Sequence, residues 1–222
     1  MIQVKIFNYM RATLAFIGFL LLFSCKKEDA NYYLEGKITD ARNGQALSAV
    51  NTEVQKQVIS NGIYGGTFSL AARTSTDNGG AYALGWAREN FAALKLIAQK
   101  DNYITKEIPL TVSSFTSGET LRLNVEMHPE AFIMVRIVNI GDAQEEDYYN
   151  FKFTNAIFDC SCCDTQWKYF EGPSIDSTFG CRLYGDMWLR YQSDIHTAEI
   201  DTVRNDSIWC SAFQTTELEI TY

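Results

Sequence analysis

Histidine, the residue that most often serves as a general acid or base, is scarce in the sequence. The chain contains two histidines, His128 and His196, and they lie in separate halves of its 222 residues. No motif sets either histidine in the pattern of a Ser-His-Asp or Cys-His site. A Gly-rich phosphate loop and a Walker motif are also absent, and no pair of carboxylates stands out on facing strands. These absences predict a protein that is not an enzyme and holds no cofactor.

Positive charge is also scarce. The chain has 19 Lys and Arg residues against 27 Asp and Glu residues, which gives a net charge of −8, and no basic cluster offsets it. An acidic surface of this kind repels nucleic acid and anionic lipid headgroups. We therefore expect no nucleic-acid partner.

Long apolar runs are missing too. The longest, residues 12–23, is shorter than the roughly 18 residues that a membrane-spanning helix needs. It follows Lys5 and Arg11 and ends just before the small residue Ser24. A basic start, a short apolar run and a small residue before the cut are typical of a secretory signal.

The four residues that end this segment, Leu22-Phe23-Ser24-Cys25, resemble the lipobox of a bacterial lipoprotein. The resemblance implies that residues 1–24 are a lipoprotein signal peptide and that Cys25 becomes the acylated first residue. Several acyl chains together make a durable anchor, so we expect the mature chain to be attached to a membrane through its lipid.

The residues after the anchor, Lys27-Glu28-Asp29, resemble the Lys-acid-acid export signal of surface lipoproteins in the Bacteroidota. Lys26 stands where an Asp would mark inner-membrane retention in other Gram-negative bacteria. We expect residues 25–32 to be a lipidated linker and the protein to be exposed on the cell outer membrane. The alternative is an ordinary solvated linker.

The mature chain has the length of two domains. Removal of the signal peptide leaves 198 of the 222 residues and, because two basic residues are lost, a net charge of −10. Period-two alternation and recurring Asn-Gly and Ser-Gly turns predict short strands, and no long amphipathic helical pattern appears. The apolar rows expected to face a core are 82/84/86, 94/96/98, 133/135/137, 149/151/153 and 187/189/191. The pattern restarts after Pro129. We predict an all-β protein of two consecutive Ig-like or transthyretin-like β-sandwiches, at residues 33–129 and 130–222.

The first half resembles a carboxypeptidase regulatory-like domain over about residues 33–128. The resemblance rests on an ordered series of blocks, which are residues 36–40, 43–47, 49–52, 76–84, 94–98 and 121–127. Thr76-Asp77-Asn78-Gly79-Gly80-Ala81-Tyr82 is close to the Thr-Asp-x-x-Gly-x-Tyr hairpin of that family. Ala46 departs from it, because the family usually has proline there. The resemblance implies a transthyretin-like scaffold with an accessory role and no catalytic residue.

All cysteines other than Cys25 lie in the second half, at Cys160, Cys162, Cys163, Cys181 and Cys210. In an oxidising compartment, two disulfides and one free thiol are expected, in one of fifteen arrangements. We expect bridges from the cluster at residues 160–163 to Cys181 and to Cys210. A thiolate metal site is the alternative, but no paired Cys-x-x-Cys motif or nearby histidine supports it, so no metal is predicted.

Trp188 is the candidate binding residue. It shares a strand face with Arg190 and Gln192, opposite the apolar row of the same strand. An indole flanked by polar groups can stack on a sugar ring. Alternatively, the second face of the sheet is also buried or a loop covers the indole. The other tryptophans, Trp86, Trp167 and Trp209, are expected in the core.

Three short Asp-(Ser/Thr)-x segments resemble the O-glycosylation signal of the Bacteroidota, with Ser177, Thr202 and Ser207 as acceptors. The alternative is that each is a turn followed by a strand.

These features favour a non-catalytic cell-envelope lipoprotein that acts as a binding or accessory module for a glycan or for an envelope protein. An adhesin or pilus-type structural subunit, as in the fimbrillins, is the second hypothesis. A carbohydrate hydrolase on a sandwich fold is the third.

Acylation of Cys25 is the first testable prediction. Cells that express the wild-type chain should incorporate a fatty-acid analogue into it, and the Cys25→Ala variant should not, because the acyl acceptor is gone. The measurement is in-gel detection of the label. Equal labelling of both chains would contradict the lipoprotein signal.

Overall fold

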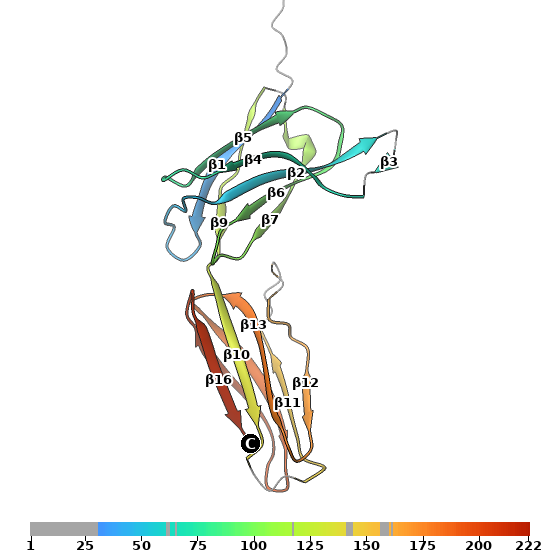
Figure 1. Cartoon of the computed structure of the whole chain (residues 1–222), viewed down its shortest axis with the longest axis vertical. Coiled ribbons are helices and arrows are strands. Elements are labelled where there is room, and N and C mark those ends of the chain that lie inside the picture. The colour runs from blue at the N-terminus through green and yellow to red at the C-terminus, as the bar shows by residue number, and fades with distance from the viewer. Residues whose placement is uncertain are drawn as a thin grey trace, which may run out of the picture.

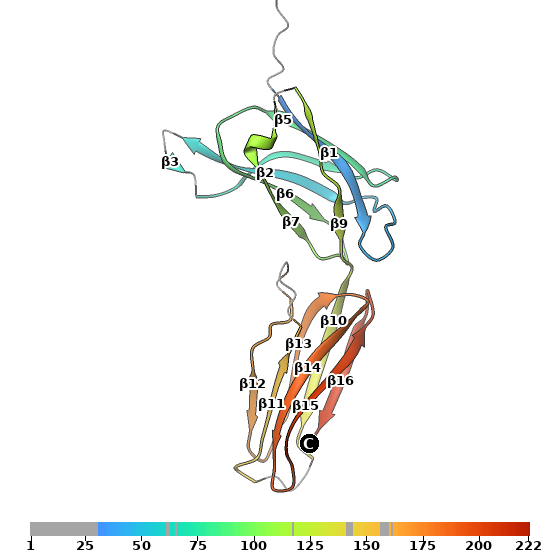
Figure 2. The same ribbon diagram turned by 180° about the vertical axis from the view of Figure 1, so that it is seen from behind.

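The protein is an all-β chain whose two halves are stacked end to end (Figures 1 and 2). The computed structural model describes residues 31–60, 63–64, 66–116, 118–140, 144–155, 160 and 162–222. Within that part of the chain, no helix has the length and apolar character that crossing a membrane requires.

The first half contains two sheets. In one sheet, β1 (Asn31–Asp40) is the central strand: it runs antiparallel to one neighbour and parallel to two short strands on its other edge. Those neighbours are β5 (Ala81–Ala87), β8 (Thr120–Arg122) and β9 (Val125–Met127). The other sheet is antiparallel and consists of β2 (Asn51–Ser60), β3 (Ile63–Tyr64), β4 (Ser69–Ser75), β6 (Phe91–Gln99) and β7 (Lys106–Leu110). A single 3₁₀ turn, η2 (Val112–Ser114), follows β7.

Alternation along the strands determines which side chains fill the first core. Tyr82, Leu84 and Trp86 on β5 are each 5% exposed or less, while the residues between them are exposed. Leu94 and Leu96 on β6 are also buried. The expected inward rows of both strands are therefore confirmed. Burial of each large side chain stabilises the fold by about 1.5–3 kcal/mol.

The predicted hairpin between β4 and β5 forms through Asp77. Its Oδ1 accepts hydrogen bonds from the backbone N–H groups of Gly79 and Ala81, both at 2.8 Å. Gly80 has a φ of +75°, and a Cβ there would lie 2.6 Å from the carbonyl oxygen of Ile38. The turn therefore needs glycine for its backbone conformation and for the close approach of β1.

The second half also contains two sheets around its own core. One sheet has the order β13 (Asp176–Tyr184), β10 (Glu130–Val138), β16 (Thr215–Thr221), with β16 parallel to β10. The other has the order β12 (Lys168–Glu171), β11 (Tyr148–Phe153), β14 (Met187–His196), β15 (Asp201–Cys210). The predicted inward rows are confirmed, with almost no exposure of Ile133, Val135, Ile137, Tyr149, Phe151, Phe153 and Leu189.

The two halves meet around the short link between β9 and β10. The backbone N–H of Glu130 donates to the carbonyl of Asn102, and its carbonyl accepts from the N–H of Phe213. The N–H of Gly185 donates to the carbonyl of Pro129. These bonds tie the link to both halves.

Arg42 joins the two halves by forming an ion pair with each of them. Its guanidinium lies 2.7 Å from Asp40 of the first half and 2.9 Å from Asp186 of the second. Phe213 packs over the same guanidinium, and its ring contacts that of Tyr103. Hydrogen bonding from Arg42 lowers the pKa of Asp40 from 3.8 to about 2, against the effect of burial.

The junction should make stability sensitive to acid. Because the folded-state pKa of Asp40 lies below its unfolded value of 3.8, its ion pair stabilises the fold above about pH 4 and is lost as the pH falls towards 2. Asp40→Asn should therefore be about 2 kcal/mol less stable than wild type at pH 7. That difference should close between about pH 4 and pH 2.

Urea unfolding at pH 7, 4 and 2 measures both chains. Glu107→Gln is the control, because its ion pair with Lys95 is on the surface and should contribute little at any pH. A difference between Asp40→Asn and wild type that stays constant with pH would show that the Asp40 charge does not stabilise the junction.

Candidate functional site

The outer row of β14 carries the candidate binding residues. Trp188 is 56% exposed, whereas Leu189, its neighbour on the inner row, is fully buried. Arg190 and Gln192 lie on the same outer row as Trp188, as the alternation predicts. The described residues neither bury this row under a second layer nor cover the indole with a loop.

Trp209 on β15 lies opposite Trp188, and its expected place in the core is wrong. It is 43% exposed, and its ring contacts that of Trp188 in a T-shaped arrangement at 5.6 Å. Ile208 and Cys210 occupy the inner row instead, which leaves the residue between them outside. Trp86 is buried as expected. Trp167 is only half-buried, with the ammonium group of Lys152 4.3 Å from its ring centre.

We call the outer surface formed by β14 and β15 the Trp188 face, which consists of Trp188, Arg190, Gln192, Asn205, Ser207 and Trp209. The register pairs Trp188 with Trp209, Arg190 with Ser207 and Gln192 with Asn205. The side-chain amides of the last pair are joined by a 3.1 Å hydrogen bond. An indole pair and an amide pair therefore lie on either side of the Arg190–Ser207 pair.

The side chain of Asn155 is hydrogen-bonded to the backbone of β14 at the edge of this face. Its Nδ2 donates to the carbonyl of Trp188 at 2.9 Å, and its Oδ1 accepts from the N–H of Arg190 at 2.8 Å. The guanidinium of Arg190 makes no ion pair with any other described residue. The face thus offers apolar ring surfaces, amide donors and acceptors, and one cation that no described carboxylate pairs with.

The two histidines do not form a catalytic pair. The ring of His128 stacks on Tyr184 at the junction, with centroids 4.0 Å apart. His196 lies at the other end of the second half, stacks on Tyr148, and has its Nδ1 3.8 Å from Asp201. His196 is on the same outer row of β14 as Trp188 but at the opposite end of the strand, and His128 is on neither β14 nor β15.

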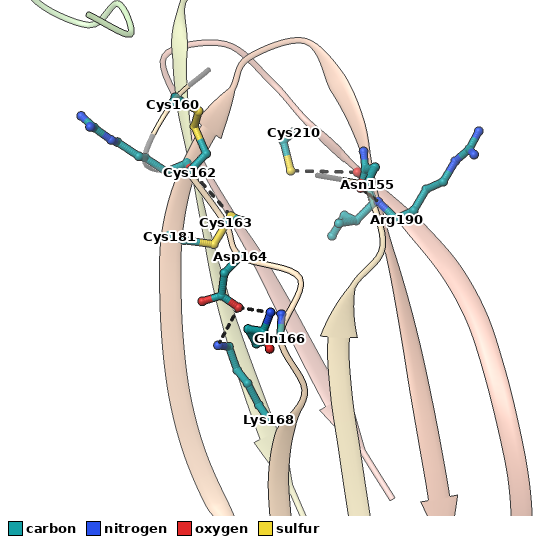
Figure 3. Close-up of a disulfide and its surroundings, with 12 residues drawn as sticks. Asn155, Cys160, Cys162, Cys163, Asp164, Gln166, Lys168, Cys181, Arg190 and Cys210 are labelled. Atoms are coloured by element: carbon teal, nitrogen blue, oxygen red, sulfur yellow. Dashed lines mark hydrogen bonds and ion pairs between the residues drawn. A yellow bond between two sulfur atoms is a disulfide. The ribbon is translucent and has the colours of Figure 1, made fainter. Parts of the chain in front are cut away.

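The cysteines form two disulfides, and the expected bridge to Cys210 is wrong. The bridges join Cys160 to Cys162 and Cys163 to Cys181 (Figure 3). The N–H of Cys163 donates to the carbonyl of Arg182, so its segment lies alongside β13, which carries Cys181. Cys210 is a buried free thiol at the end of β15, and burial raises its pKa.

The three glycosylation candidates differ in access. Ser207 is exposed on the Trp188 face. Ser177 and Thr202 are half-buried, and they pair with the inward-facing Ile137 and Ile195. The signal peptide, Cys25 and the residues Lys27, Glu28 and Asp29 lie outside the described residues.

No family model matches the chain, and no curated protein matches it in sequence. Among solved structures, the chain is similar to the Bacillus anthracis TIE protein, with 9% identity, a TM-score of 0.34, and coverage of 86% of this chain but only 34% of that one. It is also similar to shaft pilin SpaA from Lactobacillus rhamnosus GG (12% identity, TM-score 0.31, coverage 86% and 96%). A streptococcal ancillary pilin gives 9% identity, a TM-score of 0.31, and coverage of 86% and 62%. These similarities assign no function to the chain.

The disulfide pattern predicts one free thiol. In a soluble Cys25→Ser chain, thiol titration after unfolding without reductant should count one thiol, and Cys210→Ala should count none. Joint replacement of Cys163 and Cys181 by alanine should cost about 3 kcal/mol of stability, because the bridge closes a loop with a sequence separation of 18. Three or more thiols in the Cys25→Ser chain would contradict the pattern.

Proposed function

We propose that this protein is a non-catalytic, lipid-anchored binding module of the bacterial cell envelope, and that the Trp188 face holds its partner. The observation that carries the proposal is the pair of exposed indoles, Trp188 and Trp209, in contact on one open sheet face. Burial of an indole stabilises a protein by a few kcal/mol, and this pair forgoes much of that gain in the free chain. Partner binding recovers it, which is why tryptophan is frequent among residues that dominate binding energy.

The partner that we propose is a glycan or another envelope protein. The lipobox at Cys25 supports a membrane anchor, and Lys27-Glu28-Asp29 supports display on the outer membrane surface. The first half then serves as an accessory domain of the carboxypeptidase regulatory-like type. It separates the anchor from the second half, because β1 enters at the end of the first half that is far from β10 (Figure 1).

Trp188→Ala should separate binding from stability. Because the indole is more than half exposed, its loss should cost about 1 kcal/mol of stability or less, mainly from the contact with Trp209. Binding of the partner should weaken by about 2 kcal/mol or more. Leu189→Ala is the matched control from the inner row, and it should cost about 2–5 kcal/mol of stability.

Two measurements test this prediction. Urea unfolding gives stability, and binding is measured by affinity electrophoresis in envelope polysaccharide and by capture of solubilised envelope proteins. Loss of retention in Trp188→Ala with near-wild-type stability supports the Trp188 face. A strongly destabilised Trp188→Ala chain with unchanged retention would contradict it.

A further inference from the structure

A pocket lies at the end of the second half that is far from the junction. There β10, β14 and β16 end and β11 and β15 begin (Figure 2). The pocket has a volume of about 340 Å³, within the range of small-molecule sites. Its lining comes from both sheets and from the β14–β15 turn, and includes Asn139, Asp147, Thr197, Glu199, Arg204 and Tyr222.

Asp147 gives this pocket a buried acceptor. The residue is 6% exposed, and the side chain's hydrogen bond within the described residues is from the backbone N–H of Gln144 to Oδ2, at 3.0 Å. No cation of the described residues forms an ion pair with it. A buried carboxylate normally has a counter-charge or several donors, because its desolvation is costly. One of its oxygens is therefore available to a donor that enters the pocket.

Arg204 supplies the complementary donor. It is exposed on β15 at the pocket and makes no ion pair within the described residues. Burial raises the pKa of Tyr149, while its hydrogen bond with Ser193 and the nearby charge of Arg204 lower it. The ring of Tyr149 contacts that of Tyr222, with centroids 4.9 Å apart. Tyr222, in contact with Tyr149, therefore gives an aromatic wall to the pocket that Arg204 also lines.

The rim is preformed by the β14–β15 turn. The Thr197 N–H donates to the carbonyl of Ile200 at 2.7 Å, and its Oγ1 accepts from the N–H groups of Glu199 and Ile200. Ile200 is 38% exposed and adds an apolar edge. Little ordering is therefore required when a ligand enters.

We propose that this pocket binds an uncharged sugar residue. A hydroxyl group both donates and accepts, so neighbouring hydroxyls can donate to Asp147 and accept from Arg204 at once. An ammonium group only donates, which would leave Arg204 without a partner. A carboxylate or phosphate only accepts, and the charges of Asp147 and Glu199 would repel it. The apolar face of a sugar ring suits the aromatic wall at Tyr222.

This site is independent of the Trp188 face. Trp188 is near the start of β14 and Thr197 just follows its end, so at about 3.3 Å per residue the two lie roughly 30 Å apart along the strand. Loss of either site leaves the other in place.

The test is a titration of the soluble Cys25→Ser chain followed by amide NMR. The probes are methyl glycosides of glucose, galactose, mannose and N-acetylglucosamine, with glucosamine and glucuronate as charged competitors. At least one neutral glycoside should give saturable shifts confined to residues 139, 144–148, 195–204 and 221–222, and should bind more tightly than either charged sugar. Asp147→Asn and Arg204→Gln should each weaken this binding about tenfold, as for loss of a hydrogen bond to a charged group.

Matched variants separate binding from folding. Asp164→Asn also alters a carboxylate that accepts from a local backbone N–H, and Arg182→Gln removes an exposed guanidinium from β13; both should bind as wild type does. The spectra of Asp147→Asn and Arg204→Gln away from the pocket should match wild type. Absence of saturable shifts for every neutral glycoside, or tighter binding of glucosamine or glucuronate, would overturn the proposal. Either outcome would leave the Trp188 face untouched.

Discussion

Each core strand of this protein places one row of side chains between two sheets, and that constraint decides what the other row can do. On β14 the inner row holds Leu189 and Ile195, so the side chains of the outer row do not pack into the core. The outer row of β5 carries small residues, alanine and glycine, whereas that of β10 carries Phe132 and Met134, which are 46% and 40% exposed. Trp188 and Trp209 add two indoles in contact on one outer surface, where burying them would be favourable. This pair of exposed indoles is the observation on which the proposed binding surface rests.

The junction turns two separate cores into one elongated body. Arg42 bridges Asp40 and Asp186, and the backbone bonds of Glu130 fix the link from both sides. Asp40 is almost fully buried, so its pairing with Arg42 avoids an uncompensated buried charge. The consequence is geometric. An anchor at the start of the first half would hold the pocket at the end of the second half as far from the membrane as the chain allows.

Period-two patterning was sufficient to predict the inward rows, because a strand beside a core must alternate. It placed Ile133, Val135 and Ile137 correctly, and it put Trp188 on the outer row. It failed at Trp209, because β15 is mostly polar and offers no clear apolar row from which to set the phase. The pocket could not be predicted from the sequence, for a different reason. Its residues are far apart in sequence, and only the pairing of two sheets brings Asp147 and Arg204 to the same end.

The edges of the second half bear on the choice between a binding module and a subunit that polymerises by strand addition. An added strand needs an open, uncharged edge of some length. β12 has only four residues, and the edge strand β16 alternates acidic side chains, including Glu217 and Glu219, along its outer row. β15 carries Asp201, Arg204 and Asp206 within ten residues. These are devices by which sheet proteins avoid edge-to-edge pairing. They disfavour strand addition at β12, β15 and β16, whereas the fourth edge strand, β13, has nine residues and accepts a backbone hydrogen bond from the N–H of Cys163.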